Sequence, residues 1–257
     1  MSMTPYYETE LGKLYRGDCL EIMPMLEPVD LVITNPPYNI GISSGGGFEI
    51  VGDKGLWPKA SRDGGLRYGY GQYGDKMPWP EYEEWQKKIL LSAWGILKEN
   101  GAIFYNHKPR CQDGEVRLPT IYNPGLPLRQ IVIWNRGNGF NFSPSHYLPF
   151  HEWILIFAKE KFRLKSKGAS GISDVWGMTA KANKYHPAPF PLDLPMNVLT
   201  TNNGEFTLDP FIGSGTTAIA CERLNRRWIG IEISEAYCKI AKERIERERK
   251  NRRLPGF

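Results

Sequence analysis

Short apolar strands alternate with helical patterns along this chain, and this alternation restricts its fold more than any other feature. The residue pattern predicts a strand over 206–209, a helix over 216–224 and another strand over 228–232. Strands joined through a helix in this way pair in parallel, because the helix crosses over one face of the sheet. The expected fold class is therefore α/β, a doubly wound and mostly parallel sheet with helices on both faces.

The remaining elements follow from the same periodicities. An amphipathic helix is predicted from Pro80 to a stop at Asn100-Gly101, and Ser234 is placed to cap a last helix. We see no internal repeat and expect one domain over 1–257. The further predicted elements are strands at 14–16, 29–34, 102–105, 129–134 and 153–158 and a short helix at 19–26.

Two segments interrupt the alternation. Residues 41–78 are rich in glycine and lack an apolar period, which predicts a long mobile loop. Its basic residues Arg62 and Arg67 are candidates for nucleic-acid contact, although a solvated insert would have the same composition. Residues 160–185 are small and basic, as in a phosphate-contacting loop or an ordinary solvated one. The basic candidates in this second segment are Lys161, Arg163 and Lys165.

The composition narrows the class of protein without identifying it. The formal net charge of +5 suits a polyanionic partner but also fits many other proteins. No apolar run approaches the length of a membrane span, and the N-terminus lacks the pattern of a secretory signal, so we expect a cytoplasmic protein. The four cysteines form no C-x-x-C pair, so neither a metal site nor a disulfide framework is expected.

A first chemical motif lies where a strand meets a helix. The strand runs into a glycine-rich turn, Asp209-Pro210-Phe211-Ile212-Gly213-Ser214-Gly215-Thr216, and the helix follows. The glycines let the backbone approach a ligand closely, and the helix N-terminus favours polar or anionic groups. The next strand ends at Glu232, whose carboxylate can accept both hydrogen bonds of a ribose diol. These features predict an adenosine-type cofactor, either a nicotinamide dinucleotide or S-adenosylmethionine.

The second motif, Asn35-Pro36-Pro37-Tyr38, directly follows a buried strand. Its prolines fix the backbone and leave the Pro36 carbonyl and the Asn35 side-chain oxygen as acceptors. Two acceptors that hold the N–H groups of an aromatic amine favour a pyramidal nitrogen, whose lone pair can attack a methyl sulfonium. Tyr38 offers a face on which an extruded base can stack. The motif therefore favours S-adenosylmethionine and methyl transfer by positioning, whereas a plain Asn-Pro turn is the alternative.

Together the two motifs resemble those of the amino-methyltransferases that modify DNA. The chain is most similar to their permuted, beta-type group, in which the catalytic tetrapeptide precedes the cofactor loop. The resemblance extends from Gly17 to about Ile245. It implies a seven-stranded, Rossmann-like methyltransferase sheet with an antiparallel edge strand. It also implies site-specific methyl transfer to the N6 amine of a flipped-out adenine in double-stranded DNA.

One residue departs from the usual pattern of the permuted group, which more often has Asp where this chain has Asn35. Asn keeps the acceptor oxygen and occurs in other adenine N6 enzymes, whereas cytosine N4 enzymes tend to have Ser. Asn35 therefore favours adenine. A cytosine N4 methyltransferase and a non-catalytic DNA-binding protein of the same fold remain the alternatives.

The resemblance also implies roles for other residues. Asp18 is expected to bind the cofactor adenine, residues 186–191 to cover the cofactor, and residues 160–185 to take the place of a target-recognition region. Arg136 and His146 line the base pocket or DNA cleft, or simply pack. The implied cofactor-binding set is Asp18, Cys19, Asn35, His186, Pro187, Phe190, Asp209, Phe211, Gly213, Ser214, Gly215, Thr216 and Glu232. Expected partners are double-stranded DNA, a restriction endonuclease and a second copy of the chain.

Overall fold

The computed structural model describes residues 4–39, 77–112, 114–137, 144–179 and 191–253. Its helices are α1 (Cys19–Ile22), α2 (Trp79–Gly95), α3 (Lys167–Ser170), α4 (Asp193–Thr201), α5 (Thr216–Arg223) and α6 (Glu235–Arg253), with 3-10 turns at Met23–Met25 and Pro119–Tyr122. Its strands are β1 (Tyr7–Glu8), β2 (Gly12–Arg16), β3 (Val29–Thr34), β4 (Leu97–His107), β5 (Arg110–Gln112), β6 (Glu115–Arg117), β7 (Leu128–Asn135), β8 (His151–Ala158), β9 (Val175–Gly177), β10 (Phe206–Asp209) and β11 (Arg227–Glu232).

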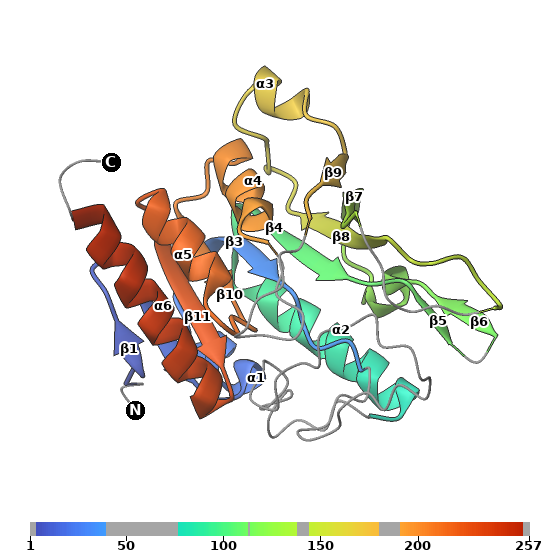
Figure 1. The fold of residues 1–257 in the computed structure, drawn as a ribbon, viewed down its shortest axis with the longest axis horizontal. Coiled ribbons are helices and arrows are strands. Elements are labelled where there is room, and N and C mark those ends of the chain that lie inside the picture. The colour runs from blue at the N-terminus through green and yellow to red at the C-terminus, as the bar shows by residue number, and fades with distance from the viewer. Residues whose placement is uncertain (1–3, 40–76, 113, 138–143, 180–190, 254–257) are drawn as a thin grey trace, which may run out of the picture.

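One mixed sheet of nine strands forms the centre of the molecule, in the order β1-β2-β11-β10-β3-β4-β8-β7-β9 (Figure 1). The five strands from β2 to β4 in this order are parallel, which confirms the predicted α/β class. The predicted count of seven is too low, because the short strands β1 and β9 extend the two edges. β1 is an antiparallel edge strand, as predicted.

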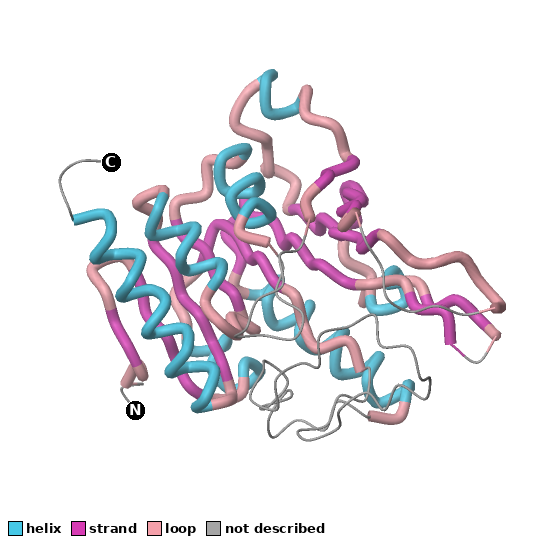
Figure 2. The backbone as a smooth tube through the Cα atoms, viewed as in Figure 1, coloured by secondary structure: helices cyan, strands magenta, loops and turns pink. Residues whose placement is uncertain are grey.

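The strand β8 runs antiparallel to both of its neighbours, β4 and β7, and lies between them inside the sheet rather than at an edge. The connection from β7 to β8 contains no helix among its described residues. A chain that returns without a crossover helix pairs antiparallel to the strand it has just left. The separate two-stranded hairpin β5–β6 lies on the side of the molecule that holds β7 and β8, away from β1 (Figure 2).

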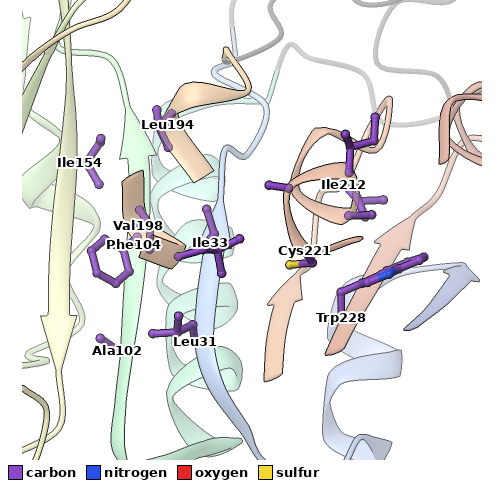
Figure 3. Close-up of a cluster of buried hydrophobic side chains, with 14 of the residues drawn as sticks. Leu31, Ile33, Ala102, Phe104, Ile154, Leu194, Val198, Ile212, Cys221 and Trp228 are labelled. Atoms are coloured by element: carbon purple, nitrogen blue, oxygen red, sulfur yellow. The ribbon is translucent and has the colours of Figure 1, made fainter. Parts of the chain in front are cut away.

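Two apolar cores cover the two faces of the sheet. Adjacent residues of β3 point to opposite faces, so Leu31 and Ile33 join a core under α4, α5 and α6, whereas Val32 joins a core under α1 and α2. Figure 3 shows Leu31 and Ile33 in the first core together with Val198 of α4. Burial of β3 on both faces holds its carboxyl end, and the tetrapeptide that follows, in a fixed position.

The helix predicted to stop at Asn100-Gly101 ends earlier, because α2 stops at Gly95 and β4 begins at Leu97. Val29 pairs with Leu97, but Leu31, two residues further along β3, pairs with Ala102. The residues of β4 between Leu97 and Ala102 therefore bulge out of the sheet. A Cβ atom on Gly101 would lie 2.8 Å from the carbonyl oxygen of Asp30. Gly101 therefore permits a close approach between strands instead of ending a helix.

The segment 160–185, predicted as a loop, contains the short helix α3 and the edge strand β9 as far as residue 179. β9 pairs in parallel with β7, and the indole of Trp134 donates to the carbonyl of Met178 (2.7 Å). The predicted loop 41–78 lies outside the described residues except for 77 and 78. None of the described helices is long and apolar enough to cross a membrane.

Candidate active site

A cavity opens at the carboxyl ends of four neighbouring strands, β2, β11, β10 and β3. Because these strands are parallel and adjacent, the loops that follow them meet at one edge of the sheet. The cavity is lined by Gly17, Asp18, Cys19, Asn35, Pro37, Trp85, Pro210, Phe211, Gly213, Glu232, Ile233 and Tyr237. The glycine-rich turn and the Asn-Pro-Pro-Tyr segment, far apart in the sequence, therefore share a single cavity.

Glu232 ends β11 at the wall of this cavity. Its Oε2 accepts from the backbone N–H of Gly213 (3.0 Å) and its Oε1 accepts from that of Ser234 (2.8 Å). Burial raises the pKa of this carboxyl to about 7. Each carboxylate oxygen has a second acceptor site, so Glu232 can still bind a diol at the position predicted for the cofactor ribose.

Aromatic side chains form part of the cavity wall. The rings of Trp85 and Phe211 meet edge to face with centroids 5.7 Å apart. Asp18 caps α1 by accepting from the backbone N–H of Leu20 (2.8 Å), and the buried Cys19 follows it. Trp85 packs against the core under α1 and α2 and also lines the cavity. Apolar walls between two carboxylates fit an adenosyl cofactor.

Four residues expected to bind the cofactor belong to the glycine-rich turn but do not line the cavity: Asp209, Ser214, Gly215 and Thr216. Asp209 accepts from the hydroxyl of Thr217 (2.5 Å) and from the backbone N–H of the turn. Ser214 is buried and accepts from the guanidinium of Arg244 through its carbonyl (2.5 Å) and its hydroxyl (2.6 Å). Thr216 is buried at the start of α5. These residues shape the turn, and contact with a cofactor remains a prediction for them.

The side-chain oxygen of Asn35 already has donors. It accepts from the hydroxyl of Tyr38 and from the amide Nδ2 of Asn106 (3.0 Å). The Tyr38 ring is buried, with its centroid 4.7 Å from that of His107. The face that was predicted to stack on a base is therefore turned into the protein in this structure, and base stacking by Tyr38 remains a prediction.

A buried carboxylate, Glu152 at the start of β8, completes this cluster. Its Oε2 accepts from Asn106 Nδ2 (2.8 Å) and lies 2.8 Å from the Tyr38 hydroxyl oxygen, whose single proton can point to Glu152 or to Asn35. Its Oε1 accepts from Arg136 Nη1 (3.1 Å). Arg136 also donates to the carbonyl of Pro149 (3.0 Å). Arg136, expected either to line the base pocket or DNA cleft or to pack, thus points inward, because it neutralises a charge buried beside the catalytic segment.

The backbone of the catalytic segment has a second support. The hydroxyl of Tyr82 donates to the carbonyl of Pro37 (2.6 Å), and its oxygen lies 2.8 Å from His107 Nε2. Burial lowers the pKa of His107 to about 3, so this imidazole is neutral. Arg110 donates to the carbonyl of Tyr38 (2.9 Å). Pro36 is buried within the same segment.

Sequence reasoning missed Asn106 and gave Glu152 no role. Both carried a signal, since each is a polar residue in or beside an otherwise apolar strand: Asn106 near the carboxyl end of β4 and Glu152 near the amino end of β8. β4 and β8 pair antiparallel, so these two positions lie at the same edge of the sheet. The pairing itself could not be read from the sequence.

The three basic candidates of the 160–185 segment, Lys161, Arg163 and Lys165, lie away from this site. Lys161 pairs with Glu99 (2.5 Å) near the amino end of β4, and the backbone N–H of Lys165 donates to Thr201 at the end of α4. Arg163 lies between them and donates to two carbonyls of its own segment. This is the edge of the sheet opposite the cavity.

The other predicted contacts divide into two groups. His146 lies in the connection from β7 to β8, within hydrogen-bonding distance of Ser145 (3.1 Å). The rest fall outside the described residues: Arg62, Arg67, His186, Pro187 and Phe190.

Comparison with known proteins identifies the family of this chain. The sequence model of a DNA methylase family, the N6/N4 methyltransferases, matches residues 29–243. The Type II methyltransferase M2.DpnII of Streptococcus pneumoniae is 29% identical over 274 residues, which cover 95% of this chain and 93% of that protein.

Two solved structures share the fold. The cytosine-N4-specific PvuII DNA methyltransferase matches with a TM-score of 0.65 and 20% identity, over 96% of this chain and 94% of that one. A DNA modification methylase of Thermus thermophilus, in complex with S-adenosyl-L-methionine, matches with a TM-score of 0.62 and 22% identity over 96% of both chains. Because the family model covers most of the sequence, this chain belongs to the N6/N4 family of DNA methyltransferases.

Proposed function

We propose that this DNA methyltransferase acts on the exocyclic N6 amine of an adenine extruded from double-stranded DNA. The observation that carries the proposal is the shared cavity, in which Asn35 faces the same space as Gly213 and Glu232. S-adenosylmethionine, the methyl donor of this family, supplies an electrophilic methyl group when it is bound. Asn35, rather than Ser, favours adenine over cytosine.

The residues around the cavity have separate roles in this proposal. Glu232 accepts from the cofactor ribose, and Trp85 and Phe211 enclose its base. Asn35 Oδ1 and the Pro36 carbonyl accept the two N–H groups of the target amine. Rate enhancement comes from holding the amine nitrogen in line with the methyl group, so no strong general base is required.

Mass spectrometry of nucleosides from DNA treated with the purified protein tests the target base. We expect N6-methyladenine, and N4-methylcytosine without N6-methyladenine would contradict the proposal.

The Asn35→Ala variant tests the mechanism, because it removes the acceptor oxygen while leaving Glu232 and the glycine-rich turn intact. It is expected to bind S-adenosylmethionine with nearly unchanged affinity and to lose methyl transfer.

The similarity to Type II methyltransferases also bears on partners. We propose that methylation protects a recognition site from a restriction endonuclease. The test is to map the methylated base and then challenge modified plasmid DNA with endonucleases whose sites contain that base. Resistance is expected, and cleavage by all of them at the mapped sites would contradict the proposal.

A further inference from the structure

We propose that Glu152 is a positioning residue for methyl transfer, which keeps Tyr38 and Asn106 hydrogen-bonded when the target amine replaces one of them on Asn35. The inference rests on the proposed catalytic role of Asn35. Glu152 is buried at 5% exposure and reaches the catalytic segment from β8, a strand that contributes no residue to the cofactor cavity.

The target amine competes with internal donors for the lone pairs of Asn35 Oδ1. The carbonyl oxygen of Asn35 has two lone pairs, and both are occupied when the Asn106 amide and the single O–H proton of Tyr38 point to it. An amine N–H that arrives at this oxygen is a third donor. One of the two internal donors must therefore release Asn35 before the target amine can be held.

The donor displaced from Asn35 needs another acceptor. A buried donor without an acceptor is costly, and that cost would oppose substrate binding. Both internal donors, however, already lie 2.8 Å from Glu152 Oε2. Asn106 can therefore release Asn35 and keep its hydrogen bond to Glu152, and Tyr38 can do the same by turning its single O–H proton from Asn35 to Glu152.

The charge of Glu152 is balanced by a neighbouring guanidinium. Glu152 Oε1 accepts from Arg136 Nη1 (3.1 Å), and Arg136 is held in turn by the carbonyl of Pro149. The pair brings no net charge into the cluster, and the ionised carboxylate offers only acceptors to its neighbours. A glutamine at this position would have nearly the same shape but would replace one acceptor oxygen with an N–H₂ donor, which conflicts with Arg136 or with the Tyr38–Asn106 pair.

The test is steady-state and single-turnover kinetics of Glu152→Gln on a DNA substrate, normalised to the fraction of protein that binds S-adenosylmethionine. We expect kcat to fall about 10- to 100-fold, as for the loss of a positioning contact. The Kd for S-adenosylmethionine is expected to stay within about twofold of wild type, because Glu152 does not line the cofactor cavity. Glu99→Gln, which removes an exposed ion-paired carboxylate at the opposite edge, is the matched control and is expected to leave kcat unchanged.

A purely structural role of Glu152 gives a different result. It would lower the melting temperature and the binding-competent fraction while leaving the normalised kcat at the wild-type value, and that outcome overturns the proposal. If Glu152→Gln does not fold, Glu152→Asp, which keeps the negative charge opposite Arg136, is measured instead. The shorter side chain is expected to lower the normalised kcat, and a wild-type kcat in this variant also overturns the proposal.

The Tyr38→Phe and Asn35→Ala variants complete the design. Tyr38→Phe removes one displaced donor, so the double variant with Glu152→Gln is expected to be less impaired than the product of the two single effects. Independent, multiplicative effects would overturn the proposal.

Methyl transfer by Asn35→Ala would overturn the catalytic role of Asn35, and the inference with it. An inactive Asn35→Ala beside a fully active Glu152→Gln would overturn only the role of Glu152.

Discussion

At the scale of single residues, the site combines buried charges with backbone donors. Glu232 has both carboxylate oxygens bound to backbone N–H groups, yet burial raises its pKa to about 7, and the charge of Asp209 acts in the same direction. Below this pH the carboxyl is protonated, and above it the carboxylate is ionised. Only the ionised form accepts two hydrogen bonds from a ribose diol without competing as a donor.

The affinity for S-adenosylmethionine is therefore expected to rise with pH through about 7, by at most about tenfold per pH unit. Calorimetric titration at pH 6 and pH 8 measures this change. Glu232→Gln cannot ionise, so it is expected to bind more weakly and with a flatter pH dependence. Equal wild-type affinities at the two pH values would show that ionisation of Glu232 plays no part in cofactor binding.

Tyr82 supports a prediction about the backbone of the catalytic segment. Tyr82→Phe removes the hydroxyl that donates to the Pro37 carbonyl (2.6 Å), so the segment loses a fixed position. We expect kcat to fall by about 10-fold with little change in cofactor affinity. Tyr122→Phe is the matched control, because Tyr122 packs edge to face on Tyr82 without contacting that carbonyl. Equal kinetics in the two variants would contradict this role of Tyr82.

At the scale of elements, the turn from β10 to α5 is held by its contact with α6. Gly215 has a φ of +87°, and a Cβ atom there would lie 3.2 Å from Ala241 of α6. The second glycine of the motif is therefore needed for backbone conformation and helix packing, whereas Gly213 lines the cavity itself. The sequence indicated close approach of a ligand at both positions, but only the packed structure separates the two requirements.

Gly215→Ala is expected to lower the free energy of unfolding by about 1–3 kcal/mol, because it combines a strained φ with a tight contact. Urea denaturation followed by circular dichroism measures the loss. Gly95→Ala serves as the comparison, since nothing lies within 4 Å of a Cβ atom at the end of α2. That variant is expected to be neutral or slightly stabilised. Equal losses in both would contradict the explanation.

At the scale of the whole molecule, the two edges of the sheet have different surroundings. The cavity and the Asn35 cluster lie at the carboxyl ends of the parallel strands, whereas Lys161, Arg163 and Lys165 lie at the amino ends. DNA that delivers a base to Asn35 must approach the carboxyl edge. Lys108, directly after β4, stands at that edge, and burial lowers its pKa.

Neutralising Lys161, Arg163 and Lys165 together with glutamine is therefore expected to leave the salt dependence of DNA binding unchanged. Each phosphate contact contributes about 0.9 to the slope of log K against log salt concentration, so three real contacts would be measurable. Lys108→Gln is expected to reduce the slope by about one such contact. Fluorescence anisotropy over a range of salt concentrations distinguishes the two variants. A flatter slope only in the triple variant would reverse this assignment of the DNA-facing edge.

Much of this molecule follows from local pattern. The strand at 206–209, the helix that starts at Thr216 and the cap at Ser234 depend on residues close in sequence, and the structure confirms each of them. The cavity follows from a general rule, since parallel strands bring their carboxyl ends to one edge. The sequence by itself therefore determined the α/β class and the meeting of the two motifs.

The rest depended on contacts between distant segments. The bulge at Gly101 exists because β3 and β4 approach closely, and the inward turn of Arg136 exists because Glu152 is buried beside it. Glu152 reaches Asn106 only because β8 enters the sheet antiparallel to β4. Local periodicity determines which residues form a strand, but the neighbours of that strand are chosen by burial and hydrogen bonding across the whole chain. For that reason only the tertiary structure decided which donors surround Asn35.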